Sequence, residues 1–350
     1  MTISEIAREF NVSPVTVSNA LNRRKGVAPE LADRIRDYAR RNGYQPSYLA
    51  KSLLKGHTSL VGLCLRAAPS DPWFAGLVNA LQNRLFAQGL YLNTIIAHQL
   101  DLSEEETIAR EKWVLDFFAQ IKAECILIGP LDSGRYQVLG NSGRNPKLVA
   151  FDALDPLPID SAGLDIYGGI HLALQHLMER GHRKIGYIGA NQFEEKNAHA
   201  RTRLALYYNF LRTHNLEQNP EWVIHMESET PENIVPALTR LLESGAPLPS
   251  AFFCHNDNFA LIAAKTLAEH RLVAGKDISL VGFDNQPVSS WASPGFTTVG
   301  FDLANHVEHI TELVLAKVRG ESFDGPIYHL EPARLIERNS VAALKQPVNF

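Results

Sequence analysis

The sequence predicts a chain of two parts: an all-α N-terminal segment, residues 1–45, and a larger α/β core of two doubly wound, parallel-sheet subdomains. Three observations favour this fold class. Apolar residues recur at helical spacing at the N-terminal end, and from residue 58 short apolar runs alternate with stretches of helical length. Residues 1–57 hold ten Lys or Arg and five Asp or Glu (+5), whereas the other 293 residues hold 24 and 33 (−9). Such an asymmetry is typical of a segment that neutralises phosphates.

Three short helices are predicted in the N-terminal segment. Residues 3–10 place their apolar side chains on one helical face, and Ser13 followed by Pro14 supplies an N-cap and a first helical residue for a second helix. Pro29 opens the third helix, which carries four arginines. A tight turn followed by a short helix with small polar side chains is typical of a helix-turn-helix that enters the major groove. A small helical cap with a solvated basic face is the alternative.

The core contains apolar runs of strand length that are separated by amphipathic stretches. They lie at residues 60–65, 91–97, 125–130, 147–153, 184–190, 251–257 and 278–284. These are too many for one mononucleotide-binding unit and fall into two groups, so we expect two α/β subdomains with a cleft between them. Ligands of such sheets bind beyond the carboxyl ends of the strands.

The N-terminal sequence resembles the DNA-binding headpiece and hinge of the LacI/GalR family of bacterial transcription regulators, and the resemblance extends over nearly the whole chain. The residues that carry it are Val12, Ser13, Val17, Ser18, Leu21 and Asn22 in the headpiece, then Tyr44, Pro46, Ala50 and Leu53. The resemblance implies a sequence-specific regulator, with repression as the expected mode, and a core of periplasmic-binding-protein architecture.

The resemblance also implies which headpiece residues bind DNA: Ser13, Pro14, Val15, Thr16, Ser18, Asn19, Asn22, Tyr44, Ala50 and Leu53. Pro14, Val15 and Asn19 would face base edges, with Thr16 and Ser18 nearer the phosphates. Many members carry a cation where this chain has Asn19, whose amide favours adenine, so the operator preference stays open. Residues 46–54 would form a hinge helix that is ordered only on DNA, with Leu53 as a minor-groove wedge. Ordinary interdomain packing of Leu53 is the alternative.

The candidate effector-binding residues follow predicted strands, where polar and aromatic groups can converge on a polar ring: Trp73, Phe74, Asp152, Arg203, Asn256 and Asp284. The resemblance supports Arg203, Asn256, Asp284 and the aromatic pair. Asp257 is interpreted instead as the N-cap of the helix that follows it. Asp284 could cap a turn, and Arg201 ranks below Arg203 because a surface ion pair would explain it.

The resemblance implies a headpiece at residues 1–45 and a hinge helix and linker at 46–57. Residues 58–157 and 289–322 would form an N-subdomain, and residues 158–288 and 323–345 a C-subdomain. We expect a homodimer on palindromic operator DNA, because one helix-turn-helix recognises few base pairs and the C-terminal stretch has no leucine-rich heptads. The effector is expected to be a sugar or sugar derivative rather than a purine. Whether it induces or corepresses stays open.

Other classes find little support in the sequence. Dinucleotide, P-loop and nucleophile-elbow motifs are absent, so we do not predict an enzyme. His306 and His309 flank Glu308 but are interpreted as a solvated helix face, and no metal or cofactor is expected. Without a signal-peptide pattern, a membrane-spanning run or clustered cysteines, we expect a cytoplasmic protein with reduced thiols. A sugar-binding transport or sensory protein of the same core fold is the alternative, and DNA retention distinguishes the two.

Overall fold

The computed structural model describes residues 1–44, 58–68, 71–97, 102–190, 198–226, 233–321 and 323–344. The chain divides into two compact units, Met1–Thr58 and Ser59–Phe350, which are considered separately here. The division lies one residue from the predicted start of the core. The predicted hinge helix, with Ala50 and Leu53, lies outside the described residues.

The first unit is a three-helix headpiece. Its helices are α1 (Ile3–Glu9), α2 (Pro14–Leu21) and α3 (Pro29–Arg41). Local signals begin each helix: Thr2 and Glu5 form a capping box at α1, and prolines occupy the first turns of α2 and α3. A small apolar core that includes Ile6, Val17 and Ile35 holds the helices together. The predicted three-helix arrangement is therefore confirmed.

The second unit contains two six-stranded sheets, A and B. In spatial order sheet A is β11 (Tyr328–Glu331), β5 (Ser161–Leu164), β4 (Leu148–Ala153), β3 (Cys125–Gly129), β1 (Leu60–Leu65) and β2 (Tyr91–Ile96), and all its pairs are parallel. Sheet B is β12 (Arg334–Ile336), β10 (Thr297–Gly300), β9 (Ser279–Phe283), β8 (Ala251–Cys254), β6 (Ile185–Ala190) and β7 (Val223–Met226). Only β12 of these runs antiparallel to its neighbour.

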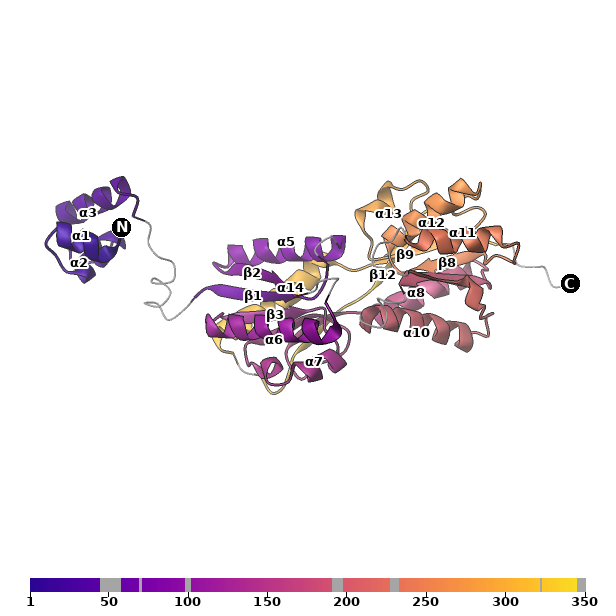
Figure 1. Ribbon diagram of the computed structural model, residues 1–350, viewed down its shortest axis with the longest axis horizontal. Coiled ribbons are helices and arrows are strands. Elements are labelled where there is room, and N and C mark those ends of the chain that lie inside the picture. Colours follow the sequence, from indigo (N-terminus) through magenta and orange to yellow (C-terminus); the bar gives the residue numbers. More distant parts are fainter. Residues whose placement is uncertain are drawn as a thin grey trace. The chain divides into compact units, whose positions relative to one another are not determined.

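Helices cover both faces of each sheet, so each half is doubly wound (Figure 1). On sheet A, α5 (Pro72–Ala87) and α14 (Leu303–Arg319) share one apolar core, and α6 (Glu104–Gln120) and α7 (Ser133–Leu139) the other. On sheet B, α8 (Ile166–Glu179) and α10 (Ala198–Thr213) cover one face, and α11 (Ile234–Glu243) and α12 (Asp257–Glu269) the other. The short helix α13 (Pro287–Trp291) follows β9.

The sheets correct three predicted subdomain boundaries. The chain crosses between the sheets after β5, after β10 and after β11, rather than at residues 157/158, 288/289 and 322/323. Residues 158–164 and 323–331 thus belong with sheet A, and residues 289–300 with sheet B. The cause is four strands that the apolar runs did not predict, β5, β10, β11 and β12. Each has three or four residues, and pairing with distant strands defines it more than its own composition does.

Candidate functional site

The recognition helix α2 is held by its own polar side chains. Ser13 Oγ accepts from the Thr16 backbone N–H at 3.1 Å, and Asn22 Nδ2 donates to the Ser18 carbonyl at 2.8 Å. Val17 is fully buried, whereas Val15 is 67% exposed. Val15 is therefore an apolar side chain that the headpiece leaves exposed at the capped start of α2.

The remaining headpiece candidates lie in different environments. Pro14 is exposed and opens α2, and Asn19 is half-buried on the same helix. Tyr44 packs against the headpiece core, and burial raises the pKa of its hydroxyl. Its aromatic ring therefore contributes to the packing of the headpiece core at the C-terminal end of the described headpiece.

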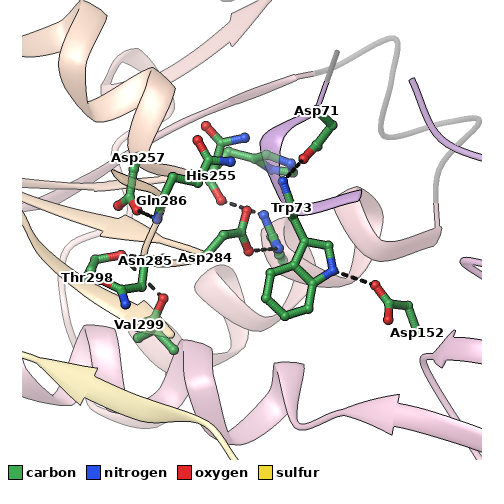
Figure 2. A network of polar contacts seen from close by, with 12 residues as sticks. Asp71, Trp73, Asp152, His255, Asp257, Asp284, Asn285, Gln286, Thr298 and Val299 are labelled. Carbon is green, nitrogen blue, oxygen red and sulfur yellow. Dashed lines mark hydrogen bonds and ion pairs between the residues drawn. The ribbon is translucent and has the colours of Figure 1, made fainter. Parts of the chain in front are cut away.

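In the core, a β-bulge positions Asp152. The register of β4 against β5 shifts between Phe151 and Ala153, and Asp152 has φ +44°. One of its carboxylate oxygens accepts from Trp73 Nε1 at 2.7 Å (Figure 2). The other pairs with His306 Nε2, also at 2.7 Å. Asp152 and His306 are almost inaccessible to solvent. This carboxylate therefore links the first turn of α5 to α14.

Arg203 and Asp284 form the second polar group. Arg203 Nη2 lies 3.1 Å from Asp284 Oδ1, Nη1 donates to the His255 carbonyl at 2.5 Å, and the guanidinium lies 4.4 Å from the centroid of the Phe283 ring. Arg203 is 7% exposed. Asp284 directly follows β9 in a left-handed conformation, φ +83°, which is uncommon outside glycine and common at binding sites. Burial raises the pKa of Asp284, while the neighbouring guanidinium opposes that shift.

Asp71 connects the two polar groups, because it caps the helix that carries Trp73 and interacts electrostatically with Asp284 and Arg203. Its carboxylate caps α5 by accepting from the Trp73 backbone N–H at 2.8 Å (Figure 2). Burial raises the pKa of Asp71 to about 6, the charge of Asp284 adds to the shift, and Arg203 opposes it. We call the six residues Asp71, Trp73, Asp152, Arg203, Asp284 and His306 the polar cluster. Side chains from both sheets thus meet beyond carboxyl ends of strands, as predicted.

Two sequence interpretations of residues near this cluster need correction: the N-cap assigned to Asp257 and the solvated face assigned to His306. Asn256, rather than Asp257, caps α12, because its Oδ1 accepts from the backbone N–H groups of Asn258 and Phe259. Asp257 is fully buried behind the cluster and accepts from the Gln286 backbone N–H at 2.7 Å (Figure 2). Burial, chiefly, raises the pKa of Asp257 to about 8. The candidate Asn256 therefore has its amide oxygen engaged within the protein.

The adjacent aromatic residues Trp73 and Phe74 lie in different environments. Trp73 lies against Phe301 at a ring distance of 6.0 Å, whereas Phe74 is half-buried and packs against the apolar core that sheet A shares with α5 and α14. The interpretation of the His306 stretch as a solvated face is wrong, since His306 has no exposed surface and His309 is half-buried. Sequence reasoning missed Asp71 and His306 as cluster members. The Asp-Pro start of a helix and the spacing of His306 to Ile310 and Leu313 were the signals available.

The residues that the structure describes include neither a metal-binding group nor a helix that could span a membrane. No group of three or more His, Cys, Asp or Glu there is arranged to hold a metal ion. Within the same residues, every helix is too short or too polar to cross a bilayer. Cys64, Cys125 and Cys254 are buried thiols, as predicted.

Comparison with known proteins defines the class. Residues 2–47 match the family model of bacterial regulatory proteins of the lacI family, and residues 174–341 match a periplasmic binding protein-like domain. The HTH-type transcriptional repressor PurR of Aliivibrio salmonicida is 27% identical over 98% of this chain and 99% of its own. PurR of Pectobacterium atrosepticum is 28% identical over 97% of both chains.

Solved structures share the fold. A lac repressor dimer bound to operator and the anti-inducer ONPF has a TM-score of 0.81 at 22% identity, over 98% of this chain and 99% of that one. The complex of the transcriptional regulator CelR with cellobiose has a TM-score of 0.67 at 23% identity, over 97% and 99%. The helix-turn-helix headpiece and the two-sheet core define a DNA-binding transcription regulator, not an enzyme. The chain belongs to the LacI/GalR family.

Proposed function

We propose that the chain is a homodimeric repressor whose affinity for a palindromic operator is controlled by a small polar effector, a sugar or sugar derivative, bound at the polar cluster. The observation that carries the proposal is the combination, in one chain, of a capped recognition helix with a buried Arg203–Asp284 pair beyond the strand ends of the core. A transport or sensory protein would have no use for the former. The operator and repressor assignments also follow the PurR relatives, which are named as repressors.

On the DNA side, Pro14, Val15 and Asn19 would reach base edges from the recognition helix. Ser13 and Asn22 already bond within the helix, so they would fix its ends and contact phosphates from there. The Arg23-Arg24-Lys25 loop is exposed and would add phosphate contacts. Leu53 remains the proposed hinge wedge, and Ala50 a proposed DNA contact.

The dimer proposal has support on the edge of sheet A. Phe86 on α5 and Tyr91 on β2 are 66% and 48% exposed, and their rings meet edge to face at 6.0 Å. A second copy covering this pair would bury apolar surface that a monomer leaves in water. Light scattering of the purified chain tests the dimer directly.

For the effector, the cluster favours a sugar over a purine. A purine needs an aromatic face on which to stack, but the Trp73 indole is bonded to Asp152 and packed edge to face on Phe301, and the half-buried Phe74 packs against the apolar core of sheet A. Carboxylates and a guanidinium in one buried group suit hydroxyls, which both donate and accept. The relatives include PurR repressors and a regulator in complex with cellobiose, and the polar cluster supports the choice of a sugar.

The test separates DNA binding from effector binding. An operator selected from random duplexes should bind the full chain in a salt-dependent manner, and removal of residues 1–57 should abolish that binding. Arg203→Ala and Asp284→Ala should each eliminate the ligand response in a melting-temperature screen against sugars. If the effector is an inducer, both variants should keep basal operator affinity. Full retention of operator binding without residues 1–57 would contradict the regulator proposal, and normal effector affinity in both variants would contradict the assigned site.

The hinge has its own test. Leu53→Ala should shrink the operator's advantage over random DNA by a few kcal/mol while leaving the salt slope largely intact. Leu54→Ala, one position further round the predicted helix, is the control. Wild-type discrimination and bending by Leu53→Ala would rule out the wedge.

A further inference from the structure

The C-terminal end of the recognition helix α2 is weakly stabilised by its own sequence. The Arg24 N–H closes the last turn by donating to the Asn19 carbonyl at 2.9 Å, with Arg23 in the left-handed conformation, φ +52°. Glycine is the usual residue at such a position, because a Cβ disfavours this conformation. The accompanying bond from the Arg23 N–H to the Ala20 carbonyl is long, at 3.4 Å. The Ala20 carbonyl is therefore poorly satisfied by neighbouring backbone.

Arg36 of α3 supplies a better donor for this carbonyl. Its Nη1 donates to the Ala20 oxygen at 3.0 Å, although the two residues are 16 positions apart, and Ala20 has no exposed surface. A guanidinium beside the last carbonyls of a helix also interacts favourably with the helix dipole. Among residues 1–44, the side-chain hydrogen bonds of α2 lie within the helix and its caps. Arg36 thus provides a polar connection between α2 and α3.

The guanidinium of Arg36 is engaged within the headpiece. Its Nη2 donates to Asp33 Oδ1, one turn earlier on α3, and 28% of the side chain is exposed. Arg40 and Asp37 repeat the same ion pair one turn further along α3, with 2.9 Å between Arg40 Nη2 and Asp37 Oδ1. The Arg40 side chain is 80% exposed, and its described hydrogen bond lies within α3. The two arginines therefore differ in the bond that only Arg36 makes to α2.

We propose that Arg36 positions the recognition helix: it fixes the C-terminal end of α2, so that the side chains proposed to read base edges meet them in register. The inference rests on that proposed role of Pro14, Val15 and Asn19. Base contacts depend on exact placement, and short side chains such as Val15 have little reach with which to compensate for a displaced helix. Because its guanidinium is engaged within the headpiece, loss of Arg36 should reduce sequence discrimination rather than electrostatic attraction to DNA.

The experiment compares Arg36→Met with Arg40→Met in the full chain. Methionine keeps an apolar stem and removes the charge and the donors. Dissociation constants are measured for a selected operator and for a random duplex of the same length, at several salt concentrations. Arg36→Met should bind the operator about tenfold or more weakly, whereas its affinity for the random duplex changes by less than about threefold and its salt slope is unchanged. Arg40→Met, the matched control, should keep the ratio of the two affinities.

A phosphate contact would give a different result. Equal losses on both duplexes, with a salt slope lower by about one, would identify Arg36 as such a contact and overturn the proposal. An unchanged ratio of affinities in Arg36→Met would overturn it as well. Failure of the unmodified chain to select any operator would instead overturn the proposed function and this inference with it, so the two failures are distinguishable.

Hydrogen exchange separates a displaced helix end from an unfolded headpiece. Peptides that cover residues 20–25 should exchange faster in Arg36→Met, and those from α1 and α3 should not. Arg36→Lys keeps the charge but lacks the planar fork that reaches two acceptors, so it should recover only part of the discrimination. This variant carries the same comparison if Arg36→Met unfolds the headpiece. Full recovery by lysine would show that charge alone acts and would overturn the proposal.

Discussion

Replacement of Asp152 by alanine should destabilise the core more than any single substitution on its surface. The carboxylate accepts from Trp73 and pairs with His306, both at 2.7 Å, and His306 is fully buried. Loss of the acceptor leaves a buried imidazole nitrogen and a half-buried indole N–H without this partner, at about 1–3 and about 1 kcal/mol respectively. Alanine in the left-handed conformation, φ +44°, adds about 1 kcal/mol. We expect a loss of about 3–5 kcal/mol in the free energy of unfolding.

A double-mutant cycle tests the cause. Asp152→Asn should cost less than alanine, because asparagine tolerates the left-handed backbone and keeps one acceptor. In Asp152→Ala with His306→Leu, both polar partners are gone, so the double variant should lose at least about 1 kcal/mol less than the sum of the single losses. Urea denaturation of the full chain, followed by far-ultraviolet circular dichroism and calorimetry, measures these values. Additive losses, or a loss below about 0.5 kcal/mol for Asp152→Ala, would refute the reasoning.

Three further predictions concern parts of the fold outside the cluster. Burial lowers the pKa of His182, which bonds Ser250 Oγ and the Ala342 carbonyl at 2.9 and 3.0 Å. The unfolded chain thus takes up that proton first, so the contribution of His182 to stability should be level above about pH 6.5 and fall below it. Thermal melts at several pH values should therefore show a smaller loss below about pH 6.5 in His182→Gln than in the unmodified chain. Gly62→Ala should cost about 1–3 kcal/mol in urea denaturation, since its Cβ would lie 2.3 Å from the Phe118 ring, whereas Gly76→Ala, with 3.5 Å to its nearest neighbour, should not. Ser13→Ala should cost the headpiece about 1 kcal/mol in thermal melts, and Ser13→Asp, which retains a capping oxygen, should cost less.

Elements stabilised by interactions that are local in sequence could be predicted, whereas elements defined by distant pairing could not. The headpiece helices begin at caps and prolines that are adjacent in sequence, so Ser13-Pro14 and Pro29 predicted their starts. The long apolar strands of both sheets were predicted for the same reason. Strands such as β12, three residues that follow the third crossing, form because distant strands offer them hydrogen bonds, and no short-range pattern encodes that pairing.

The site was predictable only in part for a related reason. Strand ends predicted that Asp152, Arg203 and Asp284 would lie at one edge, and the structure brings them together with Trp73. The partners of each group could not be predicted, because they come from the packing of separate elements. His306 pairs with Asp152, which lies 154 positions earlier in the sequence, and α12 is capped by Asn256 rather than by the expected Asp257.

The segments that cross between the sheets connect the polar cluster to the rest of the core. Glu331, fully buried at the end of β11, lies at the start of the third crossing and bonds to the other two. Its carbonyl accepts from the Asp165 N–H at 2.9 Å, and its carboxylate accepts from the Asp302 N–H at 3.3 Å and from Asn305 Nδ2 at 2.5 Å. Phe301, in the second crossing, contacts both Trp73 and Phe283, at ring distances of 6.0 and 5.9 Å. Because protein interiors are close-packed, a displacement of Trp73 by a ligand has to be accommodated at Phe301 and hence in the crossing that Glu331 holds. A ligand bound at the cluster, as proposed above, would therefore act on the segments that connect the two halves of the core.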